Sequence, residues 1–578
     1  MTPALVLTAQ AAELSRAARA WMAQDPDQVT CAELAVLLTR HEAGEPQATA
    51  ALEEAFSSLR FGTAGLRGRL GAGPHRMNRV TVIRAAAGLC AYLRQTLGDG
   101  FTVVIGYDAR HNSAQFARDT AAVVTGAGGR ALLFDGHCPT PVLAFAVRRL
   151  KADAGVMVTA SHNPPQDNGY KVYLGGRVVS GPGQGAQVVP PYDEWISQRI
   201  NAVGDVSTVP MPRGGWQSVP GRIRQEYVER ASRAGRMGAC APLTIVLTSM
   251  HGVGGQMCRQ ALARAGFTDV VPVAEQELPD PDFPTLAFPN PEEPGAMDLA
   301  LDLARTVGAD LVIANDPDAD RCAAAVPDGH ATGGWRQLTG DEVGALLGEQ
   351  AAELAAFTGS GVLASSVVSS RLLRRIAQAH GLDYRQTLTG FKWISRVPGL
   401  VFGYEEALGY CVDPHAVRDK DGISAAVRLA VLASVLKQQG RSVTDLLDKL
   451  ARMHGLHATA PLAVRVEDPA QIRAMMDRLR GGGSPAALAG SPVVSCLDLL
   501  DGACDSNGGT LPPTDALEWL TAADDRVIVR PSGTEPKLKC YCEVIVPVAV
   551  DEPVEVARRT ACERLAAIRS DLRGVLGI

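Results

Sequence analysis

Several residue types are scarce in this chain of 578 residues, and each scarcity excludes a class of protein. Aromatic residues make up 5%, too few for the stacking platforms that bind single-stranded nucleic acids. Lys and Arg number 56 against 62 Asp and Glu, so the formal net charge is −6. Because no overall positive field exists to attract polyanions, we expect no nucleic-acid partner.

Long hydrophobic runs are also missing. The longest helical apolar stretch, residues 422–436, is interrupted by Arg428 and is too short to cross a bilayer. The N-terminal region carries Glu13, Asp25 and Asp27 where a secretory signal would be basic and then apolar. The twelve cysteines contain no CxxC pair, which disfavours a zinc site or a disulfide framework. These features predict a soluble cytoplasmic protein with reduced cysteines and no membrane partner.

The chain does have the composition of a globular protein with several cores: 46% hydrophobic residues, 20% charged residues and a mean hydropathy of +0.03. Residues 1–55 are rich in Ala and Leu at helical spacing and predict a helical extension. Beyond them, β-branched runs alternate with amphipathic helices, which we predict at 84–97, 224–234, 256–265, 341–354 and 425–437. This alternation predicts α/β layers with parallel or mixed sheets.

Five apolar runs end abruptly in polar loops. These runs read VVIGYDAR, GVMVTASHNP, LVIANDPDADR, LVFGYEEALGY and RVIVRPSGTEPK. Ordinary turn chemistry explains any one of them, since Gly, Pro, Asp and Asn are typical turn residues. Ligand sites in α/β proteins form at the carboxyl ends of strands, so five such loops together favour a shared ligand site.

The third loop contains Asp316, Asp318 and Asp320 directly after a buried-looking run. Three carboxylates this close repel one another unless water or a cation separates them, and hard oxygen ligands suit Mg²⁺ or Ca²⁺. An EF-hand is excluded because Arg321 and Pro327 stand where it needs Gly and Glu. Arg321 is suited to a phosphate that the metal also contacts. The alternative is a solvated acidic turn.

The second loop places Ser161 after an apolar strand, in a segment stiffened by Pro164 and Pro165. The G-x-S-x-G elbow of serine hydrolases is absent. His162 follows directly, but neighbouring side chains in an extended loop usually diverge, so we do not expect a Ser–His base pair. A phosphorylated Ser161 is more coherent, because its phosphate adds an oxygen for the metal and Lys171 can stabilise the transferring charge. The alternative is an ordinary turn serine.

The fifth loop combines short hydroxyl residues, a glycine and flanking cations. Ser532 and Thr534 surround Gly533, which lets backbone N–H groups approach an anion, and Arg530 and Lys537 lie on either side. The segment is not a Walker A loop, because G-x-x-x-x-G-K-[ST] does not occur there. The pattern predicts a phosphate cradle, with an ordinary turn as the alternative.

The fourth loop contains two adjacent glutamates, Glu405 and Glu406. Carboxylates accept hydrogen bonds from vicinal hydroxyls, which predicts sugar binding. An ion pair with Arg418 or Lys420, or a solvated turn, is an equally good interpretation of this loop alone.

Taken in order, these segments resemble the α-D-phosphohexomutase superfamily, which includes phosphoglucomutases and phosphomannomutases, and most of all its phosphoglucomutase-like branch. The resemblance covers the chain from about residue 60 to its end. The matching segments are FGTAGLRG (61–68), GYDARHNS (106–113), TASHNPPQDNGYK (159–171), DPDADR (316–321), TGFKWI (389–394), GYEEALGY (403–410), RDKDG (418–422) and RPSGTEPK (530–537).

The resemblance implies an α/β fold of four domains around a central cleft: three similar mixed-sheet α/β domains and a smaller C-terminal α+β domain. It places the helical extension and the phosphoserine loop in 1–210 and the metal-binding loop in 211–335. The sugar-binding loop then lies in 336–455 and the phosphate-binding loop in 456–578.

The resemblance also implies the roles of single residues. Ser161 would carry the phosphoryl group, and Mg²⁺ would bind Asp316, Asp318, Asp320 and the phosphate on Ser161. The implied catalytic residues are Ser161, Arg67, Lys171 and His162, although a structural role for His162 fits equally well. The implied substrate-binding residues are Arg321, Lys392, Glu405, Arg530, Ser532, Gly533, Thr534 and Lys537.

The implied activity is the interconversion of glucose 1-phosphate and glucose 6-phosphate, by an isomerase that binds small sugar phosphates as a monomer or homodimer. Glucose 1,6-bisphosphate would be the intermediate and activator. Two departures weaken the choice of hexose: Ala407 stands where many members have Ser, and His415 only approximately matches a family histidine. The alternatives are a phosphomannomutase, a phosphopentomutase, a Mg²⁺-dependent phosphatase with Asp316 as nucleophile, and a non-catalytic sugar-phosphate sensor.

Overall fold

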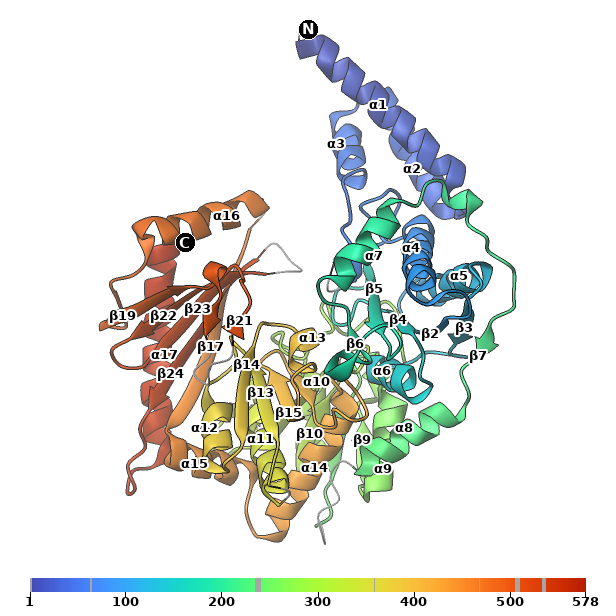
Figure 1. The fold of residues 1–578 in the computed structure, drawn as a ribbon. Coiled ribbons are helices and arrows are strands. Elements are labelled where there is room, and N and C mark those ends of the chain that lie inside the picture. Colours follow the sequence, from blue (N-terminus) through green and yellow to red (C-terminus); the bar gives the residue numbers. More distant parts are fainter. Residues whose placement is uncertain are drawn as a thin grey trace. The chain divides into compact units, whose positions relative to one another are not determined.

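The computed structural model describes residues 3–62, 65–233, 241–357, 359–466, 468–504, 510–532 and 537–578 (Figure 1). The chain forms two compact units. The first comprises residues 1–236, 244–322 and 413–427, and the second comprises residues 237–243, 323–412 and 428–578.

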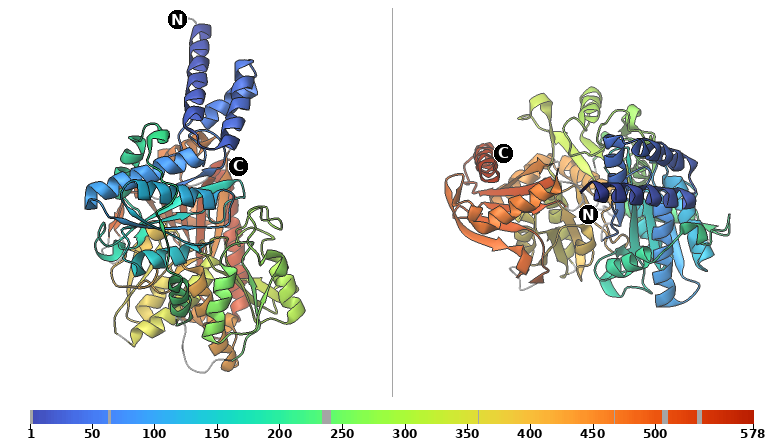
Figure 2. Two further views of the ribbon diagram at one scale, coloured as in Figure 1. Left: turned by 90° about the vertical axis from the view of Figure 1, so that its right-hand side faces the viewer. Right: turned by 90° about the horizontal axis from the view of Figure 1, so that it is seen from above.

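The first unit begins with three helices, α1 (Pro3–Gln24), α2 (Gln28–Glu42) and α3 (Pro46–Ala55), drawn in dark blue in Figure 2. The Asp27 side chain caps α2 by accepting from the Val29 N–H. Trp21, Leu34 and Leu52 are buried in the same core as the sheet that follows. The predicted helical extension is therefore present, and its buried residues share one hydrophobic core with the first sheet and its helices.

The main sheet of the first unit is mixed, with strand order β1-β5-β4-β2-β3-β7 and β6 paired to β5. Strands β4, β2, β3 and β7 run parallel, whereas β5 is antiparallel to β4, β1 and β6. The strands are β1 (Leu66–Arg69), β2 (Thr102–Tyr107), β3 (Arg130–Leu133), β4 (Ala154–Val158), β5 (Asp167–Leu174), β6 (Ala186–Gln187) and β7 (Gln217–Ser218). The helices of this part are α4 (Arg79–Leu97), α5 (Ser113–Gly126), α6 (Thr140–Arg149) and α7 (Tyr192–Asn201).

A second α/β segment completes the first unit. It contains α8 (Arg222–Arg233), β8 (Ile245–Thr248), α9 (Gly255–Ala265), β9 (Val270–Pro272), α10 (Asp298–Val307) and β10 (Leu311–Ala314). Strand β8 pairs in parallel with both β9 and β10. Every residue of β8 and β10 is buried, as expected for parallel strands covered on both faces.

The second unit contains another α/β sheet of order β14-β13-β15-β16, in which only the pairing of β15 with β16 is antiparallel. The strands are β13 (Val362–Ser366), β14 (Asp383–Thr387), β15 (Leu400–Glu405) and β16 (Gly409–Cys411). An antiparallel pair is formed by β11 (Ala323–Pro327) and β12 (Trp335–Gln337). The helices are α11 (Gly340–Ala356), α12 (Leu372–Ala379), α13 (Phe391–Ile394), α14 (Gly422–Gln438), whose first turns belong to the first unit, and α15 (Val443–His454).

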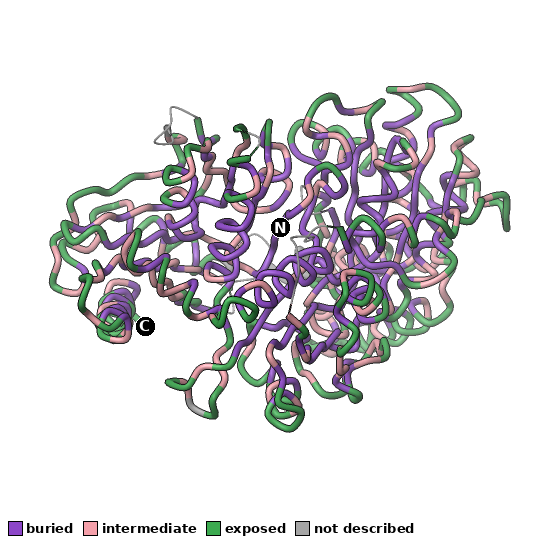
Figure 3. Tube along the Cα trace, turned by 90° about the horizontal axis from the view of Figure 1, so that it is seen from below, coloured by how far each residue is buried: buried purple, intermediate pink, exposed green. Residues whose placement is uncertain are grey.

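The C-terminal part of the second unit is an antiparallel sheet of order β17-β24-β23-β22-β19-β18. Its core joins Trp519 to one face of the last helix, α17. The elements are β17 (Leu456–Arg465), α16 (Pro469–Arg478), β18 (Ala487–Leu488), β19 (Ser491–Asp498), β20 (Ala503–Cys504), β21 (Thr510–Leu511), β22 (Leu517–Thr521), β23 (Arg526–Pro531), β24 (Lys537–Val546) and α17 (Val554–Leu576). In Figure 3 the buried stretches run through the inside of each unit.

The predicted fold class is confirmed: mixed and parallel α/β segments are followed by a smaller α+β segment with an antiparallel sheet. The five helices predicted from the sequence are present as α4, α8, α9, α11 and α14. Among the described helices, none combines the length and apolar character needed to cross a membrane. The exact boundaries predicted between the four domains stay predictions.

Candidate active site

Ser161 lies three residues beyond the fully buried strand β4 and is itself 3% exposed. Its φ of 52° is in the left-handed region, where non-glycine residues are rare. Residues held in such strained backbone conformations are often found at functional sites. The Ser161 N–H donates to Thr159 Oγ1 at 2.9 Å, which stabilises this turn. The Ser161 hydroxyl donates to Asp316 Oδ2 at 2.7 Å. The structure thus joins two residues that the sequence analysis placed at one site.

The three aspartates follow β10 and form a compact, buried cluster. Asp316, Asp318 and Asp320 each offer an oxygen within 4.8 Å of the others. Ala319, between the last two, has a φ of 57°, which turns the backbone so that alternate side chains converge. Burial and the charges of the other two aspartates raise the pKa of Asp316 well above its usual range. A cluster with this much unbalanced negative charge favours a cation.

Lys171 partly balances that charge. It extends from β5 and donates from Nζ to Asp318 Oδ2 at 2.7 Å and to Asp320 Oδ2 at 2.9 Å. Burial opposes its positive charge, but the negative charges of Asp318 and Asp320 outweigh burial, so the pKa of Lys171 is raised. The Thr140 hydroxyl also donates to Asp318 Oδ2, at 2.6 Å. The cluster is therefore held in place from two other elements of the same unit.

The oxygen set fits Mg²⁺. Asp318 Oδ1 and Asp320 Oδ1 are buried and, within the described part of the chain, accept no hydrogen bond. Such orphaned carboxylate oxygens are costly unless a ligand satisfies them. With an Asp316 oxygen and a phosphate oxygen on Ser161, they would supply the all-oxygen donors that this ion prefers.

The serine loop is fixed by Arg110, a buried residue of the GYDARHNS segment. Its guanidinium donates to the carbonyl oxygens of Ser161 at 2.7 Å, Asn163 at 2.5 Å, Pro164 at 2.7 Å and Asp167 at 3.1 Å. The segment is one of the loops predicted to follow a strand, but Arg110 is not among the site residues predicted from the sequence. Arg110 follows β2, which pairs with β4, the strand before Ser161. Its place after a strand was the signal that could have assigned Arg110 to the site.

His162 contradicts one expectation. Its Nδ1 lies 3.3 Å from Ser161 Oγ, so the two neighbouring side chains do not diverge. The left-handed backbone at Ser161 is the physical reason, because it replaces the extended conformation that the expectation assumed. Burial, together with the positive charges of Arg321 and Arg67, holds the pKa of His162 well below its usual range. The imidazole is therefore neutral near pH 7.

Arg67 and Arg321 lie around the same loops. Arg67, on β1, donates from Nη1 to Asn163 Oδ1 at 3.1 Å, and burial lowers its pKa. The Arg321 backbone N–H donates to Asp316 Oδ1 at 3.0 Å, and its partly exposed guanidinium lies 3.5 Å from Glu292. Both predicted basic residues are thus next to the serine and aspartate loops.

Glycines of the same unit allow the backbone to approach the aspartate loop closely. A Cβ on Gly252 would overlap Pro317, and one on Gly254 would overlap Ala319. A Cβ on Gly422 would overlap the carbonyl oxygen of Arg321. Larger residues at these three positions would displace the loop that carries the aspartates.

The remaining predicted residues belong to the second unit. Lys392 is in α13, Glu405 ends β15, and Arg530 is near the end of β23, and all three are partly exposed. Ser532 and Lys537 close the β23–β24 connection, where the Ser532 N–H donates to the Lys537 carbonyl at 2.8 Å. The predicted Gly533 and Thr534 lie outside the described residues.

Glu406 has a different environment from Glu405. Its carboxylate accepts from Ser366 at 3.1 Å and from Ser369 at 3.0 Å, and burial and the charge of Asp341 raise its pKa. Ser366 ends β13 and Ser369 follows it, so these hydrogen bonds fix the loop after β15 to a neighbouring strand. The two glutamates could not be distinguished from the sequence, because they are adjacent and nothing local indicates which one is bonded.

Glu543 is a buried carboxylate of the second unit that is paired with cations. The Glu543 carboxylate accepts from the Ser370 hydroxyl at 2.8 Å, from Arg371 Nε at 2.6 Å, and lies 3.2 Å from both Arg526 and His457. Burial opposes the negative charge of Glu543, but the charges of Arg526 and Arg371 and the hydrogen bond with His457 outweigh burial and hold the pKa of Glu543 well below its usual range. This network connects α12 to strands β17, β23 and β24.

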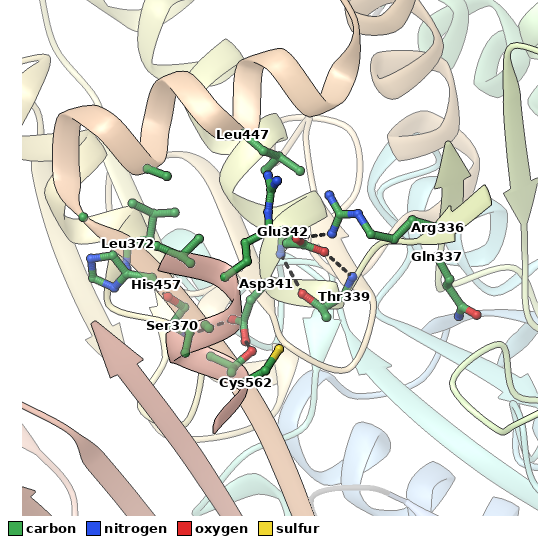
Figure 4. A pocket seen from close by; sticks show the side chains of 17 residues that line it. Arg336, Gln337, Thr339, Asp341, Glu342, Ser370, Leu372, Leu447, His457 and Cys562 are labelled. Atoms are coloured by element: carbon green, nitrogen blue, oxygen red, sulfur yellow. Dashed lines mark hydrogen bonds and ion pairs between the residues drawn. The ribbon is translucent and has the colours of Figure 1, made fainter. Parts of the chain in front are cut away.

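A cavity of about 270 Å³ lies beside this network in the second unit (Figure 4). The buried Asp341 lines it and accepts hydrogen bonds from the Ser370 N–H, the Thr459 hydroxyl and the Tyr404 hydroxyl. Arg336, also in its wall, pairs with Glu342. Among the described residues that were predicted to form the site, none lines this cavity.

Four sequence families match consecutive parts of the chain. Their descriptions are phosphoglucomutase/phosphomannomutase alpha/beta/alpha domain I (residues 58–205), domain II (225–329), domain III (339–453) and the C-terminal domain (462–552). The predicted serine loop falls in the first match, the aspartate loop in the second, the sugar loop in the third and the RPSGTEPK segment in the fourth.

Individual relatives match over most of their length. A protein of Haemophilus influenzae named probable phosphomannomutase is 44% identical, over 81% of this chain and 93% of its own. The human phosphopentomutase is 34% identical, over 95% of this chain and 94% of its own. The structure of parafusin, a phosphoglucomutase from Paramecium, has a TM-score of 0.68 at 17% identity, covering 91% of this chain and 97% of that one, and supports the fold alone.

Proposed function

Because the chain belongs to the phosphoglucomutase/phosphomannomutase family of the α-D-phosphohexomutase superfamily, we propose that it is a phosphosugar mutase working through a phosphoserine at Ser161. It would move a phosphoryl group between the anomeric oxygen and the terminal oxygen of an aldose. One observation carries the proposal: the Ser161 hydroxyl is hydrogen-bonded into a buried cluster of three carboxylates that also holds Lys171.

The residues around Ser161 would have different roles in phosphoryl transfer. The left-handed turn at Ser161 and the Arg110 contacts to backbone carbonyl oxygens fix the conformation of the serine loop, which limits where the Ser161 hydroxyl can lie. Lys171 and Arg67 are placed to stabilise negative charge on the transferring group, and His162, whose Nδ1 lies 3.3 Å from Ser161 Oγ, is the remaining proposed catalytic residue. When bound by Asp316, Asp318 and Asp320, Mg²⁺ would neutralise phosphoryl charge.

The second unit would recognise the substrate. Arg530, Ser532 and Lys537, with Gly533 and Thr534, are the proposed site for the phosphate that is not transferred, because cations and short hydroxyls suit a dianion. Glu405 and Lys392 are the proposed contacts to the sugar and its phosphate. Small sugar phosphates are the proposed partners, with a bisphosphorylated sugar as intermediate and activator.

The preferred sugar has three candidates. Glucose, with glucose 1,6-bisphosphate as the intermediate, is the assignment made from the sequence, and it stays a prediction. A pentose is the second candidate, because relatives that match over nine-tenths of this chain are phosphopentomutases. Mannose follows from the name of the Haemophilus relative.

A coupled assay tests the proposal. We expect the wild type with Mg²⁺ to isomerise at least one of the 1-phosphates of glucose, mannose, ribose and deoxyribose, and a trace of the matching bisphosphate to accelerate it. Ser161→Ala should lower kcat by on the order of 10⁴-fold or more, as nucleophile removal does in other enzymes. Ser180→Ala, at an exposed serine of the same unit, is the matched control.

Two outcomes would contradict the proposal. Mutase activity of Ser161→Ala close to that of the wild type would remove Ser161 from the mechanism. Hydrolysis of the sugar phosphates, with an acyl phosphate trapped by borohydride on Asp316 and none on Ser161, would identify a phosphatase.

A further inference from the structure

Strand β5 directs two polar side chains at acidic groups. Lys171 and Tyr173 are two residues apart, so both side chains leave the strand on the same face. Lys171 bonds to Asp318 and Asp320, as described above. Tyr173 is fully buried, and its hydroxyl donates to Asp419 Oδ2 at 2.6 Å. The proposed mechanism gives a role to Lys171 but none to Tyr173.

Asp419 is 1% exposed and receives several hydrogen bonds. Gln187 Nε2 on β6 donates to Asp419 Oδ2 at 2.7 Å, the same oxygen that Tyr173 contacts. The other oxygen accepts the Lys420 backbone N–H at 2.8 Å and lies 3.4 Å from Lys420 Nζ. A buried carboxylate with this many donors has one orientation, and its charge faces Lys420.

Lys420 in turn reaches the aspartate cluster. Its Nζ lies 3.2 Å from Asp320 Oδ2, the oxygen to which Lys171 donates at 2.9 Å. The segment that carries Lys420 is anchored to the same loop, because the Gly422 N–H donates to the Ala319 carbonyl at 3.2 Å. Two ammonium groups from separate elements therefore converge on one carboxylate oxygen beside Ser161.

We propose that Tyr173, Asp419 and Gln187 are positioning residues that hold Lys420 against the aspartate cluster during phosphoryl transfer. The proposal rests on the proposed function of Ser161. A lysine has a long, flexible side chain, and fixing its ammonium group costs conformational entropy at the moment of reaction unless the fold has already fixed it. The Asp419 carboxylate, oriented by a tyrosine and a glutamine from two paired strands, provides that fixation.

Tyr173 remains a donor across the working pH range. Burial and the charge of Asp419 raise the pKa of Tyr173 well above its usual value, so its proton stays on the hydroxyl. Its contribution is thus a constant hydrogen bond, and we expect its removal to change kcat at every pH at which the wild type is active.

The experiment is a double-mutant cycle with Tyr173→Phe and Lys420→Met. Tyr173→Phe keeps the ring and removes only the hydroxyl; we expect kcat to fall about tenfold with the sugar-phosphate KM within about twofold, as for other residues that orient a reactive group. Lys420→Met should lower kcat further, and the double variant should match Lys420→Met alone. Gln187→Met, a second removal of a donor to Asp419, should act in the same direction as Tyr173→Phe.

A matched control is available on the same strand. Tyr170 is also fully buried and its hydroxyl pairs with Thr120 at 3.2 Å, so Tyr170→Phe removes an equivalent hydroxyl without touching Asp419. We expect Tyr170→Phe to keep the wild-type kcat. Thermal unfolding of each variant separates a folding defect from a positioning defect.

The outcomes distinguish this inference from the proposed function. Additive losses in the Tyr173 and Lys420 cycle, or wild-type kcat in Tyr173→Phe, would overturn the positioning role while Ser161 dependence remains. If Ser161→Ala retains wild-type mutase activity, the proposed function fails first, whatever the cycle shows.

Discussion

The charged residues around Ser161 and those predicted to bind the sugar phosphate are built in different ways. In the first unit, the carboxylates of Asp316, Asp318 and Asp320 and the ammonium of Lys171 are buried and bonded mostly to one another. In the second unit, Glu405 and Arg530 are partly exposed at strand ends. The buried Glu543 there is paired with Arg371 and Arg526 within the protein core.

Because the two regions differ in burial, we expect them to control different kinetic constants. A buried, preorganised cluster stabilises charge that develops during the reaction, so its defects should appear in kcat. Partly exposed cations bind substrate and transition state alike, so their loss should appear in KM. The buried pairs of the second unit should affect stability and neither kinetic constant directly. Three substitutions test this division, from the largest effect to the smallest.

Asp320→Asn should produce the largest effect. It removes the charge that both Lys171 and Lys420 contact and weakens the proposed Mg²⁺ site. We expect kcat to fall on the order of 10³-fold, because charge stabilisation of this kind contributes several kcal/mol. Asp302→Asn, at an exposed aspartate of the same unit, is the control. An unchanged kcat, or an effect confined to the KM for the sugar phosphate, would contradict the expectation that the buried cluster controls kcat.

Glu543→Gln should destabilise the second unit. Removing one partner of a buried ion network costs about 3 kcal/mol, because the remaining charges lose their counterion. Since folding lowers the pKa of Glu543, its stabilisation is complete above the unfolded pKa near 4.5 and declines as pH falls below it.

Thermal unfolding between pH 3 and 7 measures this contribution. We expect the Tm of the wild type to fall more steeply below about pH 5 than the Tm of Glu543→Gln, because the variant lacks this carboxylate. Glu518→Gln, on strand β22 of the same sheet, is the matched control. Parallel Tm curves for wild type and Glu543→Gln would show that the network contributes nothing to acid stability.

Arg530→Ala should have the smallest of the three effects. Losing one charge-assisted contact to a phosphate costs about 2 kcal/mol, which is about a 30-fold increase in KM, with kcat changed much less. Arg569→Ala, at an exposed arginine of α17, controls for the change in net charge. A larger effect on kcat than on KM would show that Arg530 acts in the chemical step. It would contradict the expectation that the partly exposed residues of the second unit control KM.

Much of the site could be predicted because its residues follow strands. Ser161 after β4 and the aspartates after β10 are each preceded by an apolar run, and the run itself marks the end of the strand. The alternation of such runs with amphipathic helices also gave the α/β class. Local sequence was sufficient for these features, since each depends on a few consecutive residues.

Other features depend on contacts that local sequence does not encode. Thr140 and Asp318 are hydrogen-bonded across 178 positions, and Tyr173 and Asp419 across 246, so neither pair has a local signal. The proximity of His162 to Ser161 was missed for another reason: it depends on one left-handed backbone conformation, which serine rarely adopts.

The three N-terminal helices have a practical consequence for anyone who shortens this chain. The family match begins at residue 58, which suggests a convenient starting point for a trimmed protein. However, Leu34 and Leu52 are completely buried against the first core. A chain starting at residue 58 would expose the apolar surface that these helices bury, and we expect the truncated protein to aggregate in solution.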